Sequence, residues 1–484
     1  MLAGCRCWRD RVSPSVHAAL AAALLRYRYN LEITSCTVRR RHAPGEYKPP
    51  MSEQFNKLGH VRLVDGVRPS HAAYFLFAAF LGVSLTTFLS TIQPNLLAVN
   101  LGLPAEQQGQ ISGLALFAGE CVLLLSSSFI GAYSDRIGRR GVFVGGMFVL
   151  ALGWVLMAYV DSVVTLVAVR VFMSFGIAII NVMISALMVD YPAEASRGKL
   201  VALAGVMIGI GNIMIGLVYL KLPEVFAVHF GVSELTAIRY TLFTMAALSI
   251  FMALVVRIGI RGGPPPQARK HEAYIARVKV GISAGRENAR ILLAYFCAFV
   301  ARGDLVVIGT FFTLWLTQTG IQSGMAPSEA AATTGGLFAM VMTSALLWAP
   351  VAGWLNDHMD RAKAMALAMF LATVGYTGCA FIPDPLGPWM YPAGVLLGIG
   401  QISAVTASQT LIGQEAPPAY RGSVVGMFSM FGAAGILFIS SIGGILFDRI
   451  APVAPFILIG IVNGILCIAA LRVAKTTTPA MANN

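Results

Sequence analysis

Long apolar segments alternate with short polar segments along most of this chain. Each apolar segment is about 20 or more residues long, so an α-helix rising about 1.5 Å per residue crosses the hydrocarbon core of a bilayer. A transmembrane β-barrel would instead show alternating segments of about ten residues. The pattern predicts an all-α polytopic membrane protein with twelve transmembrane helices. The segments lie near residues 71–95, 111–133, 141–159, 163–188, 199–220, 238–256, 291–317, 331–355, 364–382, 389–411, 423–446 and 453–471.

These segments fall into two groups of six, separated by a long polar stretch rich in Arg and Lys. We therefore expect two pseudo-symmetric six-helix bundles, at residues 70–257 and 291–474. A basic cytoplasmic loop at residues 258–290 would join them. Residues 1–69 would form an N-terminal cytoplasmic extension, expected to be disordered, and residues 475–484 a cytoplasmic tail.

The first 50 residues differ in composition from the rest, with nine Arg or Lys against three Asp or Glu. Their apolar stretch "HAALAAALL" is too short to span a membrane. Two interpretations stay open. The stretch is Arg-rich and poor in acids, as in a transit peptide. Alternatively, Met51 begins an ordinary polar start, and residues 1–50 are an upstream extension outside the mature protein.

Composition and charge support a membrane protein and indicate its orientation. The chain is 57% hydrophobic and 12% charged, against about 25% charged residues in soluble proteins. The Arg and Lys residues between the predicted helices lie mostly in loops on one side, so the net charge of +13 is a topology signal and does not indicate nucleic-acid binding. Cytoplasmic loops are enriched in Lys and Arg, which predicts cytoplasmic termini. Short loops and scarce glycosylation-type sites fit a bacterial inner (plasma) membrane.

An internal repeat relates the two groups of helices. The loop "GAYSDRIGRR" at residues 131–140 has a degenerate second copy, "GWLNDHMDRAK", at residues 353–363, which is 222 positions later. A second landmark, Arg197 followed by Gly, recurs at Arg421 with an offset of 224. Such duplications are typical of secondary transporters, in which one half moves against the other around a site at the membrane midplane.

The loop G-x-x-x-D-R-x-G-R-R between the second and third helices resembles the signature loop of the major facilitator superfamily. The segment "RVFMSFGIA" resembles a second motif of that family, with Arg170, Ser174 and Gly176 at the expected spacing and Ser in place of a Gly. The resemblance covers roughly residues 70–474. It implies a membrane-embedded solute transporter with a cavity between its halves, lined by the first, fourth, seventh and tenth helices.

The signature loop is expected to form a conformational gate. Asp135 is an anion that the N-terminus of a helix starting near Gly422 would attract. The family resemblance implies a contact between Arg139 and Asp190, and these contacts would close the cytoplasmic side in the outward-facing state. The alternative is that the loop sets only topology and folding. The gate candidates are Gly131, Asp135, Arg139, Asp190, Asp357 and Arg361.

Four ionisable residues lie at membrane depth: Glu120, Arg170, Arg302 and Asp304. A charge at a helix centre costs about 2.5–3.5 kcal/mol even on the lenient insertion scale, so such residues are functional hypotheses by default. None has a charged counterpart at the repeat offset, so the repeated scaffold does not require them. The alternative is that they form buried pairs that lock helices together, with Arg302 as the partner of Glu120.

Arg302 and Asp304 are two positions apart and therefore point about 200° apart on a helix. We expect one of them to face the cavity and the other to contact a flanking helix. The family resemblance places Arg170 and Asp304 on cavity-lining helices, where they would face each other. Asp304 is then a proton-carrier candidate, because a moving Arg changes the pKa of a nearby carboxyl.

Polar candidates for substrate contact include Asn181 in the fourth helix and Gln401 in the tenth. The fifth helix carries Gly211 followed by Asn212, where drug/proton antiporters of the family carry a Gly-Pro pair. This difference weakens an antiporter assignment without excluding export.

The sequence thus predicts a secondary active transporter that moves a small organic solute by alternating access and is coupled to protons. An uncoupled facilitator is the main alternative, and a non-transporting membrane sensor is a remote one. The sequence contains no Walker loop, nucleophile elbow or metal-spaced His/Cys cluster, so we expect no enzyme, cofactor or metal site. The expected partners are a small-molecule substrate, protons and the lipid bilayer, with no nucleic acid, and we expect a monomer.

Overall fold

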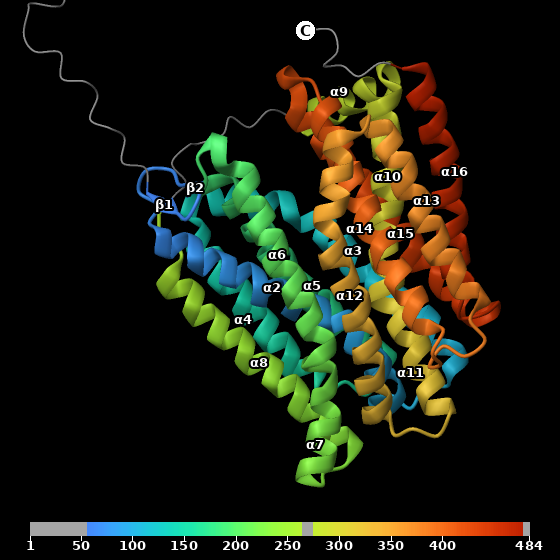
Figure 1. Cartoon of the computed structure of the whole chain (residues 1–484). Coiled ribbons are helices and arrows are strands. Elements are labelled where there is room, and N and C mark those ends of the chain that lie inside the picture. Colours follow the sequence, from blue (N-terminus) through green and yellow to red (C-terminus); the bar gives the residue numbers. More distant parts are fainter. Residues whose placement is uncertain (1–55, 264–273, 478–484) are drawn as a thin grey trace, which may run out of the picture. The chain divides into compact units, whose positions relative to one another are not determined.

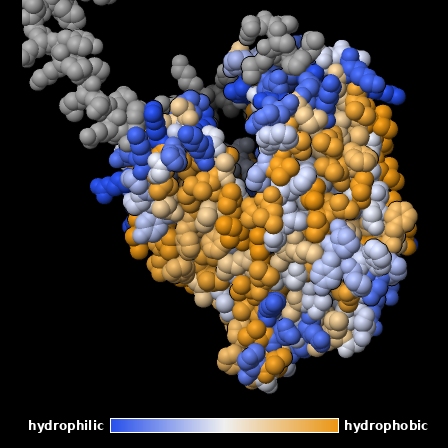
Figure 2. Space-filling model, in the orientation of Figure 1, coloured by the Kyte–Doolittle hydropathy of each residue, from blue (hydrophilic) through white to orange (hydrophobic). Residues whose placement is uncertain are grey.

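The computed structural model describes residues 56–263 and 274–477, except for the side chains of residues 274–277. Within these residues, twelve helices are long and apolar enough to cross a membrane (Figure 1). Each coincides with one predicted apolar segment, so the prediction of an all-α multi-pass membrane protein is confirmed. On the face that Figure 2 shows, hydrophobic side chains form a broad band, with hydrophilic side chains gathered at the two ends of the helices.

The first half, residues 69–259, supplies six of the spanning helices. In a bilayer every backbone N–H and C=O needs an internal partner, which long helices provide. The elements are α2 (Pro69–Asn95), the π-helical η1 (Leu96–Asn100), α3 (Ala105–Ile137), α4 (Arg139–Met157), α5 (Val163–Asp190), η2 (Glu194–Ser196), α6 (Arg197–Leu217), η3 (Tyr219–Lys221), α7 (Leu222–Phe230) and α8 (Glu234–Gly259).

The second half, residues 289–476, repeats this arrangement after the helix α9 (Tyr274–Glu287), which lies within the predicted central loop. Its first spanning helix is interrupted by a π-helical segment, so it comprises α10, η4 and α11. The elements are α10 (Ala289–Val306), η4 (Val307–Phe312), α11 (Thr313–Gln322), α12 (Pro327–His358), α13 (Arg361–Gly378), η5 (Cys379–Phe381), α14 (Met390–Glu415), η6 (Pro418–Tyr420), α15 (Arg421–Arg449) and α16 (Ala454–Thr476).

The two halves contact each other through α3 with α15 and α6 with α12. Small residues make both contacts close. A Cβ added to Gly113 would lie 2.1 Å from the carbonyl oxygen of Ser440, and one added to Gly216 would lie 2.2 Å from that of Gly335. Gly335 is 222 positions after Gly113, and Ser440 is 224 positions after Gly216, so the repeat relates these two contacts. Side chains smaller than Ala are needed at such helix crossings.

Residues 56–68 are ordered, in contrast to the expected disorder of residues 1–69. Strands β1 (Lys57–Leu58) and β2 (Val61–Arg62) form a short antiparallel hairpin, and Leu63 bridges to Pro192 in the loop after α5. The hairpin is held because Val61 and Leu63 are buried, and because the Val64 amide donates to the carbonyl of Tyr191 at 3.0 Å. The expectations for residues 1–55 lie outside the described residues.

Candidate functional site

The spanning helices end on two sides of the protein, which we call the basic end and the opposite end. The contacts between the two halves of the protein are different at these two ends. The basic end carries Arg139, Arg197 and Arg361. The opposite end carries the turns at residues 101–104 and 323–326.

At the opposite end, amide side chains join the two halves. Asn95 Nδ2 at the end of α2 donates to the Pro327 carbonyl of α12 at 3.2 Å. Gln318 Nε2 in α11 donates to the Ala105 carbonyl of α3 at 3.0 Å and to Gln108 Oε1 at 3.2 Å.

Two carboxylates strengthen the same closure by accepting from backbone amides in the first two turns of helices in the other half. Asp448, near the end of α15, accepts from the backbone amides of Gly109 and Gln110 in α3 at 2.8 and 2.7 Å. Glu234, at the start of α8, accepts from the backbone amide and hydroxyl of Ser328 in α12 at 3.0 and 2.8 Å. A carboxylate on helix N-terminal amides is favourable because it meets the positive end of the helix dipole. The opposite end is therefore closed.

At the basic end, a cavity of about 390 Å³ opens between α3, α9 and α15. Figure 2 shows a hollow in this region of the surface. Between described residues, no hydrogen bond or ion pair joins the two halves there. The cavity is lined by apolar side chains, hydroxyl side chains and one acid, Glu120. The other lining residues are Leu123, Leu124, Ser127, Ser128, Val278, Gly422, Ser423, Gly426, Met427, Ser429 and Met430.

The gate candidates of the first half contact each other in this conformation. Arg139 forms ion pairs with Asp135 at 2.6 Å and with Asp190 at 3.0 Å, and it also donates to Ser134. The expected Arg139–Asp190 contact is therefore present. The expected contact of Asp135 with the start of α15 is absent, since a Cβ at Gly422 would meet open space. This absence fits a basic end that is open.

The remaining gate candidates show no such pairing. A Cβ at Gly131 would come only within ordinary contact of Val182, at 3.9 Å, so packing does not require a glycine there. Asp357 is exposed and has no ion-pair partner among the described residues. Arg361 donates to the carbonyl of Thr410 at 3.1 Å.

Three of the four membrane charges gather beside the cavity. Arg170 is buried, and its guanidinium donates to Gln93 Oε1 at 2.8 Å and to Ser90 Oγ at 2.9 Å, both on α2. The carboxylate of Glu120 interacts electrostatically with both Arg302 and Arg170. Arg302 thus acts on Glu120 through its charge, although no ion pair between the two side chains is present among the described residues, so the alternative of a buried locking pair stays a prediction.

Arg302 is the exposed residue of its pair. Its side chain is exposed, and it lies against α15 at Gly432, where an added Cβ would be 2.8 Å from its Cγ. Gly432 is three positions after the cavity-lining Ser429, so both lie on one face of α15. Arg302 therefore lies next to the base of the cavity.

The expectation that Arg170 and Asp304 face each other is wrong. Asp304 is fully buried inside the second half, where Asn463 Nδ2 of α16 donates to its Oδ1 at 3.3 Å. The Tyr376 hydroxyl of α13 donates to the Asp304 main-chain carbonyl at 3.2 Å. The physical reason is the rotation of about 200° between positions 302 and 304, which turns Asp304 into the second half when Arg302 lies against α15.

The polar candidates Gln401 and Asn181 lie on the helices expected for them. Gln401 is buried on α14, and Asn181 is half-buried on α5. Neither side chain has a hydrogen-bond partner among the residues that the structure describes. Within the same residues, no group of three or more His, Cys, Asp or Glu is placed to hold a metal ion.

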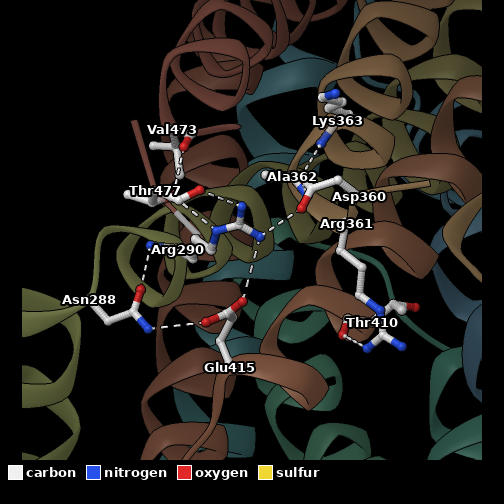
Figure 3. A network of polar contacts seen from close by, with 10 residues as sticks. All are labelled: Asn288, Arg290, Asp360, Arg361, Ala362, Lys363, Thr410, Glu415, Val473 and Thr477. Atoms are coloured by element: carbon white, nitrogen blue, oxygen red, sulfur yellow. Dashed lines mark hydrogen bonds and ion pairs between the residues drawn. The ribbon is translucent and has the colours of Figure 1, made fainter. Parts of the chain in front are cut away.

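Sequence reasoning missed a charged network at the basic end of the second half (Figure 3). Arg290 at the start of α10 pairs with Asp360 at 3.1 Å and with Glu415 at 3.7 Å. It also donates to the hydroxyl and carbonyl of Thr477, both at 2.9 Å, and thereby holds the end of α16. Asn288 donates to Glu415 at 3.2 Å. The internal repeat gave a signal for this network, because Glu415 is the last residue of α14 and Asp190, 225 positions earlier, is the last residue of α5.

Comparisons with known proteins agree with this architecture. The sequence matches the profile of the Major Facilitator Superfamily over residues 74–440 and 294–484. It is 29% identical over 413 residues to Magnetosome protein MamH of Paramagnetospirillum magneticum, covering 84% of this chain and 92% of that protein. It is 26% identical over 403 residues to Magnetosome protein MamZ of the same organism, covering 78% of this chain and 59% of MamZ.

Among solved structures, nucleoside transporter NupG superposes with a TM-score of 0.66, covering 84% of this chain and all of NupG. At 14% sequence identity, this similarity establishes only the shared fold. The match to the superfamily profile spans more than half of the chain and includes both halves of the repeat. The chain therefore belongs to the Major Facilitator Superfamily, and it is a membrane transporter and not an enzyme.

Proposed function

We propose that this protein is a proton-coupled secondary transporter that moves a small organic solute by alternating access. The observation that carries the proposal is the position of Glu120, Arg170 and Arg302 beside a cavity that is open at one end and closed at the other. Ionisable side chains are costly at this depth, and they mark substrate or proton pathways when they face a water-filled cavity.

The arrangement of the two ends supports alternating access. In the conformation described, Asp448 and Glu234 hold the opposite end closed by binding the first two turns of helices across the interface. Asp135, at the end of α3, is free of the other half, and the start of α15 at Gly422 is open. In the alternative state Asp135 binds that helix start and closes the basic end, while the opposite end opens. Lys and Arg enrichment supports our proposal that the basic end faces the cytoplasm and that the protein lies in a bacterial inner membrane.

Glu120 is the proposed coupling group, assisted by the two arginines. With Glu120 ionised the three side chains carry one net positive charge, and with Glu120 protonated they carry two. Proton binding therefore changes the charge that the solute meets in the cavity. Asp304 takes no part in this step because it lies outside the cavity. Gln401 and Asn181 are proposed to contact the solute through their free amide groups.

Uptake into proteoliposomes tests this function. Purified protein is reconstituted, a pH gradient is imposed, and a panel of radiolabelled small organic solutes is measured with and without a protonophore. We expect at least one solute to accumulate above its external concentration, and the protonophore and Glu120→Gln each to abolish this accumulation. The matched control Glu329→Gln removes an exposed acid and retains accumulation. Equilibration without accumulation would identify an uncoupled facilitator instead.

A further inference from the structure

Arg302 is a cation that no described residue hydrogen-bonds or pairs with at ion-pair distance. Its side chain is exposed within a membrane-spanning helix, and the described residues offer it neither a hydrogen bond nor an ion pair. Its electrostatic neighbour is Glu120, which lines the cavity. A guanidinium presents five N–H donors in a planar fork that matches carboxylate and phosphate oxygens.

Arg170 differs from Arg302 in its surroundings. Two of its N–H groups are taken by the neutral acceptors Gln93 and Ser90, so the guanidinium is hydrogen-bonded but its charge is not neutralised. Glu120 compensates only one of the two arginines. The site therefore carries one uncompensated positive charge in a low-dielectric region, where such charge is costly.

We infer that the transported solute carries an anionic group, a carboxylate or a phosphate, which binds Arg302 in competition with Glu120. This inference rests on the proposed transport function and names its substrate class. A monoanion would cancel the uncompensated charge. The cavity of about 390 Å³ lies within the range of about 300–1,000 Å³ typical of small-ligand sites, so the solute is a small organic anion.

Competition with Glu120 makes anion binding depend on pH. The charged groups that act on Glu120 are Arg302 on α10 and Arg170 on α5, while the cavity-lining residues of α15 are uncharged. A proton on Glu120 removes the negative charge that acts on Arg302, so the guanidinium attracts the anion without a competing carboxylate. Affinity for the anion therefore rises as pH falls, and a proton and an anion enter the site together with no net change in charge.

Ligand-dependent thermal unfolding of purified protein tests the inference, because a ligand that binds the folded state raises its apparent stability. The probes are benzoate and succinate, each compared with its uncharged amide, together with citrate and inorganic phosphate, at pH 5.5 and 7.5 as chosen conditions. The carboxylate and phosphate arms distinguish the two sources of the anionic group. We expect at least one anion to stabilise the protein more at the lower pH, and its neutral counterpart to have no effect.

Anion binding by substituted proteins tests which residues form the anion site. Arg302→Gln is expected to weaken anion binding by roughly tenfold or more, as the loss of a charge-assisted hydrogen bond does. Arg302→Lys keeps the charge and is expected to keep the preference for anions. Glu120→Gln is expected to bind the anion equally well at both pH values. The matched control Arg472→Gln removes an exposed arginine at the end of α16 and leaves binding unchanged.

Three results overturn the inference: equal stabilisation by acid and amide, unchanged anion binding by Arg302→Gln, or no stabilisation by any anion. The comparison of acid and amide needs only the wild-type protein, so it remains valid even if a variant does not fold.

Uptake measurements separate this inference from the transport proposal. Accumulation of a neutral solute under a pH gradient keeps the transporter and overturns the anionic substrate. Anion binding without pH-driven accumulation keeps the anion site and overturns proton coupling.

Discussion

Asn95 and Gln318 occupy equivalent places in the two halves, and each donates a hydrogen bond to the first turn of a helix in the other half. Gln318 lies 223 positions after Asn95, and their acceptors, the carbonyls of Ala105 and Pro327, are 222 positions apart. The pair of bonds is thus related by the internal repeat. Closure at the opposite end is a symmetric property of the duplicated fold.

The first prediction concerns these two amides. Asn95→Ala and Gln318→Ala each remove a largely buried hydrogen bond across the interface, worth about 1 kcal/mol. Each change is expected to raise the population with an open opposite end by about fivefold. The population is measured as the distance between spin labels at the exposed residues Phe230 and Trp389, one in each half. Thr244→Ala, which removes an exposed hydrogen bond within α8, is the control. Unchanged distances in both variants would contradict the prediction.

The second prediction compares Asp448, which binds backbone amides of α3 across the interface, with Asp135, which we propose binds the start of α15 in the alternative state. Asp448→Asn weakens the closure seen at the opposite end, and Asp135→Asn weakens the proposed closure at the basic end, each by about 1 kcal/mol. The two changes are expected to shift the conformational equilibrium in opposite directions and to slow transport in both cases. Spin labels at the exposed residues Ile137 and Tyr420 report the basic end. Shifts in the same direction would exclude a reciprocal pair of gates.

The twelve helices were predictable because a bilayer leaves a long apolar segment no alternative to a helix. The hairpin at residues 57–62 was not, because strands of two residues in a polar segment show no periodic pattern. At the site, the sequence established that Arg302 and Asp304 diverge, but not which of them is buried. That choice depends on how the helix is rotated against α13 and α16, where Asn463 receives Asp304. Such rotation is set by tertiary packing.

The third prediction concerns Asp304, which is fully buried, with one carboxyl oxygen unpartnered and no cation paired with it among the described residues. An ionised carboxylate there would be costly, so we expect the group to hold a proton, and an amide of the same shape is expected to replace it. Asp304→Asn should therefore fold with unchanged thermal stability and keep the pH dependence of ligand binding. Asn463→Leu, which removes the donor to Asp304, should lose about 1–3 kcal/mol. Loss of pH dependence in Asp304→Asn would make Asp304 the coupling group instead.

The fourth prediction concerns Tyr191, which joins the N-terminal hairpin to the loop after α8. Its hydroxyl accepts from the Arg261 amide at 3.1 Å, and burial raises the pKa of Tyr191 to about 12. Because the folded pKa lies above the ordinary value of 10.0, this contribution to stability is present below pH 10 and is lost as pH rises toward 12. Tyr191→Phe should lose about 1 kcal/mol at neutral pH and unfold with a weaker dependence on pH in this window. Unfolding is followed by heating at stepped pH, with Tyr133→Phe, at an exposed site, as the control.

The last prediction concerns Arg290, whose side chain is 2% exposed and faces the fully buried side chain of Glu415. Arg290→Met leaves that carboxylate without its cation and frees Thr477, so the variant should lose about 3–5 kcal/mol of stability. Adding Glu415→Gln removes the uncompensated charge and should recover most of the loss. Arg197→Met breaks an ion pair with side chains 41% and 82% exposed and should lose less than about 1 kcal/mol. Thermal unfolding in detergent measures all three. Equal losses for the Arg290 and Arg197 variants would show that the network of Figure 3 contributes no more to stability than a surface pair.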